Sequence, residues 1–326
     1  MTPQDILAKT DRDLFPGNEI AIKAAFRKLA AQWHPDHNHA PEASDVMAHL
    51  TEMKGRALHR SDRPFELFVR EDGTSFKMEY LRTMQGQGCR VFVGATNIAY
   101  FVPQSADDLG RKAAQHRWKY LNSEMEKEVA RFISPMTRQE KLKNGRLLVF
   151  RRNPDQILMR DLIDLDGPIE PVHATWMISR MVNLACYLEW AKLAHCAISP
   201  EFLLVSLDQH SVALTGPLLY GASFGTRPSA VPARTLKVAN WLINKQENAD
   251  IRVDLALIRE TALDLLGERG GARLRSNPAM REEITNWLLT PSAKTAVADY
   301  QGWEIARGDR RFAHYGKTAQ GIYDRA

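Results

Sequence analysis

A short histidine-rich segment near the N-terminus carries the first side chains whose types and spacing could do chemistry. Three histidines and one aspartate lie within six residues, namely His34, Asp36, His37 and His39. Imidazole nitrogens and carboxylate oxygens are zinc ligands, but a structural zinc site holds them in a fixed tetrahedral arrangement. These residues instead follow one another along a polar segment that contains Pro35. We therefore predict no metal site here and expect a polar loop.

Two helical patterns flank this segment and would position it. Apolar residues recur at the spacing of one helix face before it, at Ile22, Phe26, Leu29, Ala30 and Trp33. Because Pro35 disfavours helical geometry in the residue before it, the first helix is predicted to end near Trp33. The same spacing returns after the segment, at Val46, Leu50, Met53 and Ala57. The simplest arrangement is two antiparallel helices that bury facing apolar stripes.

The outer face of the first helix is basic. Lys23 and Arg27 lie one helical turn apart, and Lys28 lies beside them. Such a face is either merely solvated or an electrostatic footprint for an acidic partner surface, where it would set the rate and orientation of encounter. The residues that follow it favour the second interpretation.

The basic helix, the His34-Pro35-Asp36 tripeptide, the polar loop and the second amphipathic helix together resemble a J-domain of the DnaJ-like family, over residues 1–60. The resemblance implies docking on a DnaK-type chaperone of the heat shock protein 70 class and stimulation of its ATP hydrolysis. The first helix departs from the family, whose tyrosine-leucine-glycine signature is replaced by Ile6-Leu7-Ala8. The chaperone-binding residues implied are Lys23, Arg27, Lys28, His34, Pro35 and Asp36.

The remaining chain begins with short strands and continues with helices. Strand patterns cover 65–70, 75–84, 90–93 and 97–102, with a hairpin signal at 71–74, and a buried strand is predicted at 146–150. Residues 106–133, rich in Lys, Arg, Glu and Ala, predict one long helix. Helices that are apolar nearly all round are predicted at 176–193 and 253–266, and such helices belong inside a larger helical region.

This order resembles a protein kinase over about residues 75–310. Gly86-Gln87-Gly88 corresponds to the start of the glycine-rich loop, and the segment from His195 to Val205 resembles a catalytic loop. Asp254 matches the buried aspartate that begins the central helix of the large lobe. In the kinase frame, His195 and Asp254 are structural groups.

The resemblance also shows which catalytic groups are replaced. Phosphoryl transfer needs a lysine on the phosphates, an aspartate to orient the acceptor hydroxyl, and an asparagine and an aspartate on magnesium. The corresponding positions hold, in that order, Phe101, Ala197, Phe202 and Gly216, and a shift of one residue does not restore the set. Val91 replaces the third glycine of the phosphate loop. The resemblance therefore implies a pseudokinase with an apolar cleft, no cofactor and no enzymatic activity.

Other enzyme classes have less support in the sequence. His195 beside Cys196 could suggest a thiol dyad, but adjacent residues do not orient one another for proton transfer. Ser199, Ser206 and His210 lie close in sequence without the frame of a nucleophile elbow. The sequence contains no Walker loop, paired-cysteine metal site or dinucleotide fingerprint.

Composition excludes few classes of protein. The 326 residues are 44% hydrophobic and 25% charged, which is average for a soluble globular protein. The net charge of +5 is dispersed, because residues 1–60 hold eight basic and eight acidic groups and the excess lies in short runs at 138–152 and 307–311. We expect neither a nucleic-acid nor a membrane partner. Three cysteines without paired spacing, and an N-terminus unlike a signal peptide, predict a cytoplasmic location.

The sequence thus predicts an α+β chain with a helical J-domain hairpin at 1–60 and a bilobal kinase-like fold. The small antiparallel-sheet lobe is expected at 64–155, and the large helical lobe at 156–326, with a peripheral C-terminal arm. The combination resembles proteins of bacteria and phages. The functional hypothesis is a co-chaperone whose inactive kinase-like body binds an unknown protein client. The alternatives are an atypical ATP-binding kinase and a scaffold whose J-like helices engage no chaperone.

Overall fold

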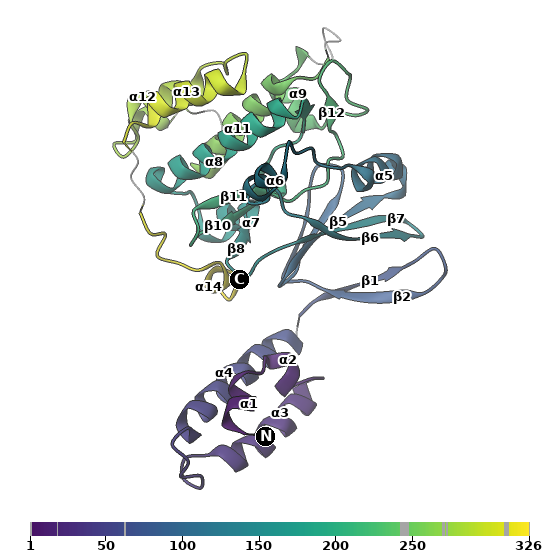
Figure 1. Ribbon diagram of the computed structural model, residues 1–326, viewed down its shortest axis with the longest axis vertical. Helices are drawn as coiled ribbons and strands as arrows, with labels where there is room; N and C mark the ends of the chain where they lie inside the picture. The colour runs from purple at the N-terminus through teal and green to yellow at the C-terminus, as the bar shows by residue number, and fades with distance from the viewer. Residues whose placement is uncertain are drawn as a thin grey trace. The chain divides into compact units, whose positions relative to one another are not determined.

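The computed structural model divides the chain into two compact units, Met1–Glu66 and Leu67–Ala326 (Figure 1). The structure describes residues 2–17, 19–61, 63–241, 248–268, 271, 273–309 and 313–325, without the side chains of 59–61. In these ranges, no helix has the length and apolar character needed to cross a membrane.

The first unit consists of helices around a small apolar core. Its elements are α1 (Pro3–Leu7), α2 (Asp11–Leu14), α3 (Glu19–Trp33) and α4 (Ala43–Ser61). Helix α3 ends at Trp33, where Pro35 was expected to stop it, and packs against α4. The apolar stripes of the two helices meet in a core that α1 and α2 complete, formed by Ile6, Leu14, Phe15, Ile22, Leu29, Val46, Leu50, Met53 and Ala57.

A five-stranded antiparallel sheet forms the small lobe of the second unit. Its strand order is β3-β4-β5-β7-β6, and a separate two-stranded sheet pairs β1 with β2. The predicted strand at 75–84 is in fact two strands, β2 and β3, that belong to different sheets, and β6 was not predicted. The strands are β1 (Phe65–Val69), β2 (Ser75–Glu79), β3 (Arg82–Gln85), β4 (Arg90–Val93), β5 (Asn97–Pro103), β6 (Met136–Leu142) and β7 (Gly145–Arg151).

The prediction of one long helix at 106–133 is also wrong. The structure has two shorter helices, α5 (Asp107–Gln115) and α6 (Ser123–Val129), separated by irregular backbone. The separating segment is held from outside, because the Tyr187 hydroxyl donates to the Lys119 carbonyl at 3.0 Å. The Asn122 side chain then caps α6 by accepting from the backbone N–H of Met125 at 2.8 Å.

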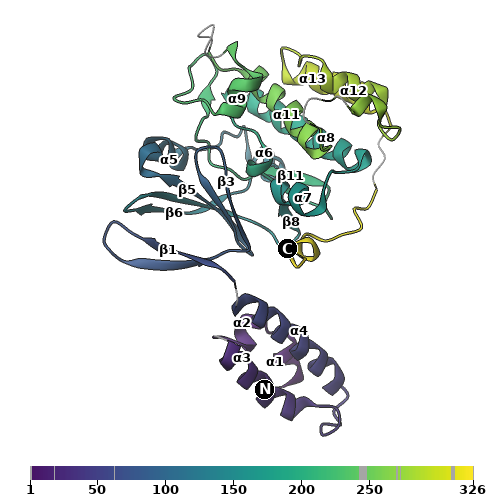
Figure 2. The same cartoon turned by 180° about the vertical axis from the view of Figure 1, so that it is seen from behind.

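The large lobe is mainly helical, with two buried helices at its centre. Helices α8 (Pro171–Trp190) and α11 (Ile251–Leu265) contain most of the two apolar segments predicted at 176–193 and 253–266. They pack side by side, and α13 (Ala296–Arg307) packs against α8 (Figures 1 and 2). The other elements are β8 (Gln156–Leu158), α7 (Met159–Asp166), β9 (Leu193–Ala194), β10 (Leu203–Ser206), β11 (Ser211–Leu214), β12 (Ala222–Ser223), α9 (Ala233–Val238), α12 (Glu282–Leu289) and α14 (Ala319–Tyr323).

The C-terminal arm is anchored rather than peripheral. It ends in α14, whose Tyr323 hydroxyl donates to the Asp161 carboxylate at 2.8 Å and accepts from the backbone N–H of Leu158 at 3.2 Å. The Arg152 guanidinium lies 4.7 Å from the centre of the Tyr323 ring. The sequence suggested a peripheral arm because apolar residues are few, but Tyr323 is buried, and Tyr315 and Lys317 also bond to the Asp166 carboxylate.

Candidate functional site

The His34-Pro35-Asp36 tripeptide begins directly at the end of α3. The backbone N–H of His34 donates to the Ala30 carbonyl at 2.8 Å, so the helical hydrogen bonding continues into the tripeptide. The backbone N–H of Asp36 donates to Nδ1 of His34 at 3.3 Å, which orients the ring. Pro35 and Asp36 are exposed, and His34 is half-buried. The three residues therefore form an ordered, accessible turn.

The loop after the tripeptide is tied back to α3. The Asn38 side-chain amide donates to the Gln32 carbonyl at 2.9 Å, and its oxygen accepts from the backbone N–H of Ala40 at 3.0 Å. His37 and His39 are exposed. Within the described ranges, no three His, Cys, Asp or Glu side chains gather as a metal ion would require.

The three predicted cations lie on the exposed side of α3. Lys23, Arg27 and Lys28 are all exposed, whereas Ile22 and Leu29 of the same helix face the core. The Lys23 ammonium pairs with Glu19 one turn earlier, and Nε of Arg27 donates to the Lys23 carbonyl at 3.3 Å. The six residues implied as chaperone-binding thus belong to one helix and the turn that follows it.

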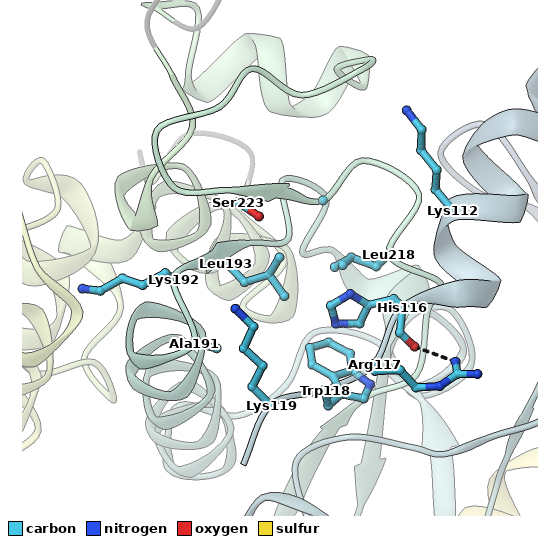
Figure 3. A pocket seen from close by; sticks show the side chains of 11 residues that line it. Lys112, His116, Arg117, Trp118, Lys119, Ala191, Lys192, Leu193, Leu218 and Ser223 are labelled. Atoms are coloured by element: carbon cyan, nitrogen blue, oxygen red, sulfur yellow. Dashed lines mark hydrogen bonds between the residues drawn. The ribbon is translucent and has the colours of Figure 1, made fainter. Parts of the chain in front are cut away.

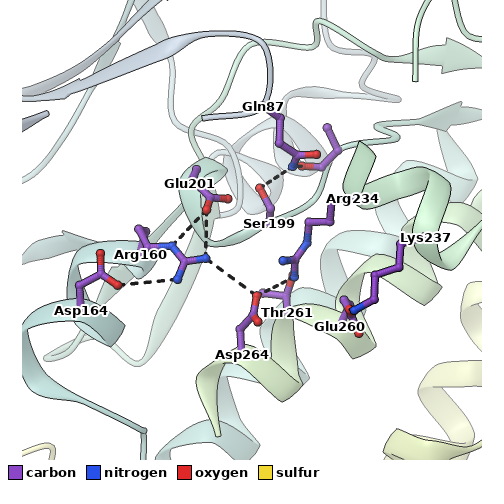
Figure 4. Close-up of polar contacts among 11 residues, drawn as sticks. Gln87, Arg160, Asp164, Ser199, Glu201, Arg234, Lys237, Glu260, Thr261 and Asp264 are labelled. Atoms are coloured by element: carbon purple, nitrogen blue, oxygen red, sulfur yellow. Dashed lines mark hydrogen bonds and ion pairs between the residues drawn. The ribbon is translucent and has the colours of Figure 1, made fainter. Parts of the chain in front are cut away.

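The second candidate site is the kinase-like cleft, and the β3–β4 loop is bonded across it. The Gln87 amide donates to the Ser199 hydroxyl at 2.9 Å and to the Ala197 carbonyl at 3.4 Å (Figure 4). The Tyr220 hydroxyl donates to the Gln87 carbonyl at 3.1 Å. At Gly88, which has φ +70°, a Cβ atom would lie 2.0 Å from that hydroxyl. The loop is therefore seated closely on the segment that resembles a catalytic loop.

Phe101 does not contribute to the cleft as predicted. Its ring lies on the other face of the sheet, with a centroid 6.0 Å from that of Phe68. Because side chains alternate along a strand, its neighbour Tyr100 faces the large lobe instead. The Tyr100 ring lies 5.5 Å from that of Phe202, and its hydroxyl donates to the Glu201 carbonyl at 2.9 Å. Tyr100 is thus the buried aromatic residue that sequence reasoning missed.

The other three positions that correspond to kinase catalytic groups lie in apolar surroundings. Phe202 and Ala197 are buried, and a Cβ atom at Gly216 would lie 2.0 Å from the Phe202 ring. The backbone N–H of Thr215 donates to the Phe202 carbonyl at 2.8 Å, which holds the two segments together. The ring of Phe202 therefore occupies the volume that a side chain at position 216 would need.

One buried carboxylate holds the start of the segment that resembles a catalytic loop. Asp254 accepts from the backbone N–H groups of His195 at 2.7 Å and Cys196 at 2.9 Å. Burial raises the pKa of Asp254 to about 7, against the opposing effect of these hydrogen bonds, and lowers the pKa of His195 to about 3. Burial also raises the pKa of the Cys196 thiol, which disfavours the thiolate that a nucleophile requires.

Carboxylates near this segment are paired with arginines. Glu201 lies 3.0 Å from the Arg160 guanidinium, and Asp264 lies 2.7 Å from Arg234 (Figure 4). These ion pairs link α7, α9 and α11 beneath the segment. These charged side chains therefore connect structural elements of the large lobe.

Comparisons with known proteins support the fold of the second unit. No protein-family model matches the sequence, and no curated protein matches it. Among solved structures, the chain is similar to one described as "Structure of vaccinia related kinase 3", with a TM-score of 0.52 and 15% sequence identity. The match covers 74% of this chain and 90% of that chain. At this level of identity the likeness establishes the architecture alone, and that architecture is a protein-kinase-like fold.

Proposed function

We propose that the protein is a cytoplasmic co-chaperone of the J-domain type, whose kinase-like body binds a protein client and does not catalyse phosphoryl transfer. The observation that carries the proposal is the exposed cationic face of α3, which runs directly into the ordered, accessible His34-Pro35-Asp36 turn. The partner is a DnaK-type chaperone.

The geometry supports a division of labour between the helix and the turn. Exposed Lys23, Arg27 and Lys28 provide long-range attraction to an acidic surface, and such charges raise association rates more than they raise final affinity. The turn provides short-range specificity, because Pro35 restricts the backbone and Asp36 bonds to the His34 ring. Contacts of the turn then bias the chaperone toward hydrolysis.

The packing of the cleft supports a body without phosphoryl-transfer activity. The β3–β4 loop is bonded to Ser199, and Phe202 packs on Gly216, so magnesium and a triphosphate would have to break the Gln87–Ser199 hydrogen bond and displace the buried Phe202 ring. The alternative function, an ATP-binding kinase, predicts a different result in a simple measurement. We expect no change in melting temperature with ATP and magnesium, and an increase that requires both would favour the kinase.

The test of the co-chaperone function is single-turnover ATP hydrolysis by a DnaK-type chaperone, with and without this protein. We expect the native protein to accelerate hydrolysis and His34→Gln to lose most of the acceleration, by about tenfold or more, equivalent to about 1.4 kcal/mol. His39→Gln is the matched control, because it makes the same change in the same loop, and it should retain the acceleration.

A charge reversal separates encounter from hydrolysis. Lys28→Glu should slow association with the chaperone, most strongly at low salt, whereas Arg12→Glu on α2 should have a much smaller effect. If the native protein gives no acceleration, or if His34→Gln and His39→Gln behave alike, the co-chaperone function is wrong and a scaffold becomes the better interpretation.

A further inference from the structure

A cavity of about 310 Å³ lies in the second unit (Figure 3). It is formed by α5, the segment that follows α5, the end of α8, and the chain around β12. Its volume is at the lower end of the range for small-molecule sites, about 300–1,000 Å³. It is lined by Lys112, His116, Arg117, Trp118, Lys119, Ala191, Lys192, Leu193, Leu218, Gly221 and Ser223.

The charge of the lining is one-sided. Five lining side chains are basic, none is acidic, and none of the five pairs with a carboxylate in the part of the chain that the structure describes. The Arg117 guanidinium donates to the carbonyls of Ala114 and His116, at 3.4 and 3.0 Å. The Lys112 ammonium donates to the Ser229 hydroxyl at 3.0 Å. These neutral partners leave the positive charge in place, in contrast to the paired arginines beneath the cleft.

Two of the basic side chains reach into the cavity itself. Figure 3 shows the Lys119 ammonium extending toward Leu193 and the His116 ring facing Leu218, while Lys112, Arg117 and Lys192 point away from the centre. Nε2 of His116 is buried and has no hydrogen-bond partner among the described residues. Burial, and then the charges of Lys119 and Arg117, lower the pKa of His116. An anion in the cavity would oppose the effect of these two charges on the ring.

Most of the remaining lining is apolar. The Trp118 ring packs edge-on against His116, with centroids 4.7 Å apart, and Leu193 and Leu218 also line the cavity. The Ser223 hydroxyl adds one neutral donor. Charge without apolar walls would suit a hydrated inorganic ion, whereas this combination suits an anion that carries a carbon skeleton.

We propose that this cavity binds a small organic phosphate, with its phosphate between Lys119 and His116 and its apolar part against Trp118, Leu193 and Leu218. A phosphate dianion compensates more of the unpaired positive charge than a carboxylate does, and it accepts more charge-assisted hydrogen bonds. The site is independent of chaperone docking, since none of its residues lies in the first unit.

Phenyl phosphate is the probe, measured by isothermal titration calorimetry on the full chain. We expect it to bind at least about tenfold more tightly than inorganic phosphate, which lacks the apolar part, and than benzoate, which carries the same ring and one charge. Lys119→Glu should weaken phenyl phosphate binding by about tenfold or more. Lys143→Glu, in the β6–β7 turn, makes the same charge change at another exposed lysine and should leave binding unchanged.

Each contrary result overturns a defined part of the proposal. Equal affinity for phenyl phosphate and inorganic phosphate would remove the apolar subsite and leave an adventitious ion only. Equal loss in Lys119→Glu and Lys143→Glu would show a response to net charge and exclude the cavity as the site. Lys119 is exposed, so circular dichroism should confirm that both variants remain folded.

Discussion

At the scale of single residues, His195 and Asp254 are two buried titratable groups with opposite responses to acid. Asp254 accepts two backbone hydrogen bonds, so its replacement by alanine would leave two buried donors without a partner, at about 1–3 kcal/mol each. The His195 ring has no protein hydrogen-bond partner among the described residues and packs against Phe202. It is held as a neutral, largely apolar group.

Replacement of His195 by phenylalanine should change how stability depends on pH. Burial lowers the pKa of folded His195 to about 3, so the unfolded chain binds a proton first and the native protein loses stability as the pH falls below about 6.5. His195→Phe removes this loss. The free energy of unfolding of the variant, measured relative to that of the native protein, should therefore rise by up to about 1.4 kcal/mol for each unit by which the pH falls from 6.5 to 4. Urea unfolding at several pH values measures it, and parallel curves would contradict it.

At the scale of elements, local patterns predicted the segments whose neighbours are close in sequence. The end of α3, the tripeptide turn, and helices α8 and α11 follow from apolar spacing and from Pro35. The single helix predicted at 106–133 is interrupted where the Tyr187 hydroxyl bonds the Lys119 carbonyl and where Asn122 caps α6, and the first of these contacts comes from a residue distant in sequence. The prediction that Phe101 lines the cleft failed because strand register decides which face of the sheet a side chain occupies. The basic cavity was missed because its lining comes from segments distant in sequence.

The close packing of the β3–β4 loop against the segment that resembles a catalytic loop leads to a testable prediction. Gly88→Ala adds a Cβ atom at φ +70° and 2.0 Å from the Tyr220 hydroxyl, so it combines backbone strain of about 1–2 kcal/mol with a steric clash. Gly73→Ala, at φ +88° with nothing within 4 Å, should show the strain alone. Tyr220→Phe removes the clashing oxygen and should partly restore Gly88→Ala. Thermal denaturation of the single and double variants measures both effects, and equal losses for the two glycines would mean that the loop is not seated.

At the scale of the whole molecule, the two units have separate apolar cores. The core residues of the first unit all lie between Ile6 and Ala57, and those of the second all lie at Phe68 or beyond. Separate cores would suit the proposed co-chaperone, because the docking unit would keep its structure whatever the body binds.

Leu50→Ala tests that separation. Leu50 is fully buried in the small core of the first unit, so its truncation should cost about 2–5 kcal/mol there. Amide hydrogen exchange should accelerate across α3 and α4, and stimulation of the chaperone should fall as the basic face and the turn lose their support. Exchange in β3–β7, α8 and α11, and the affinity for phenyl phosphate, should match the native protein. Faster exchange in the second unit would show that the two cores are energetically coupled, and the division into an independent docking unit and body would then be wrong.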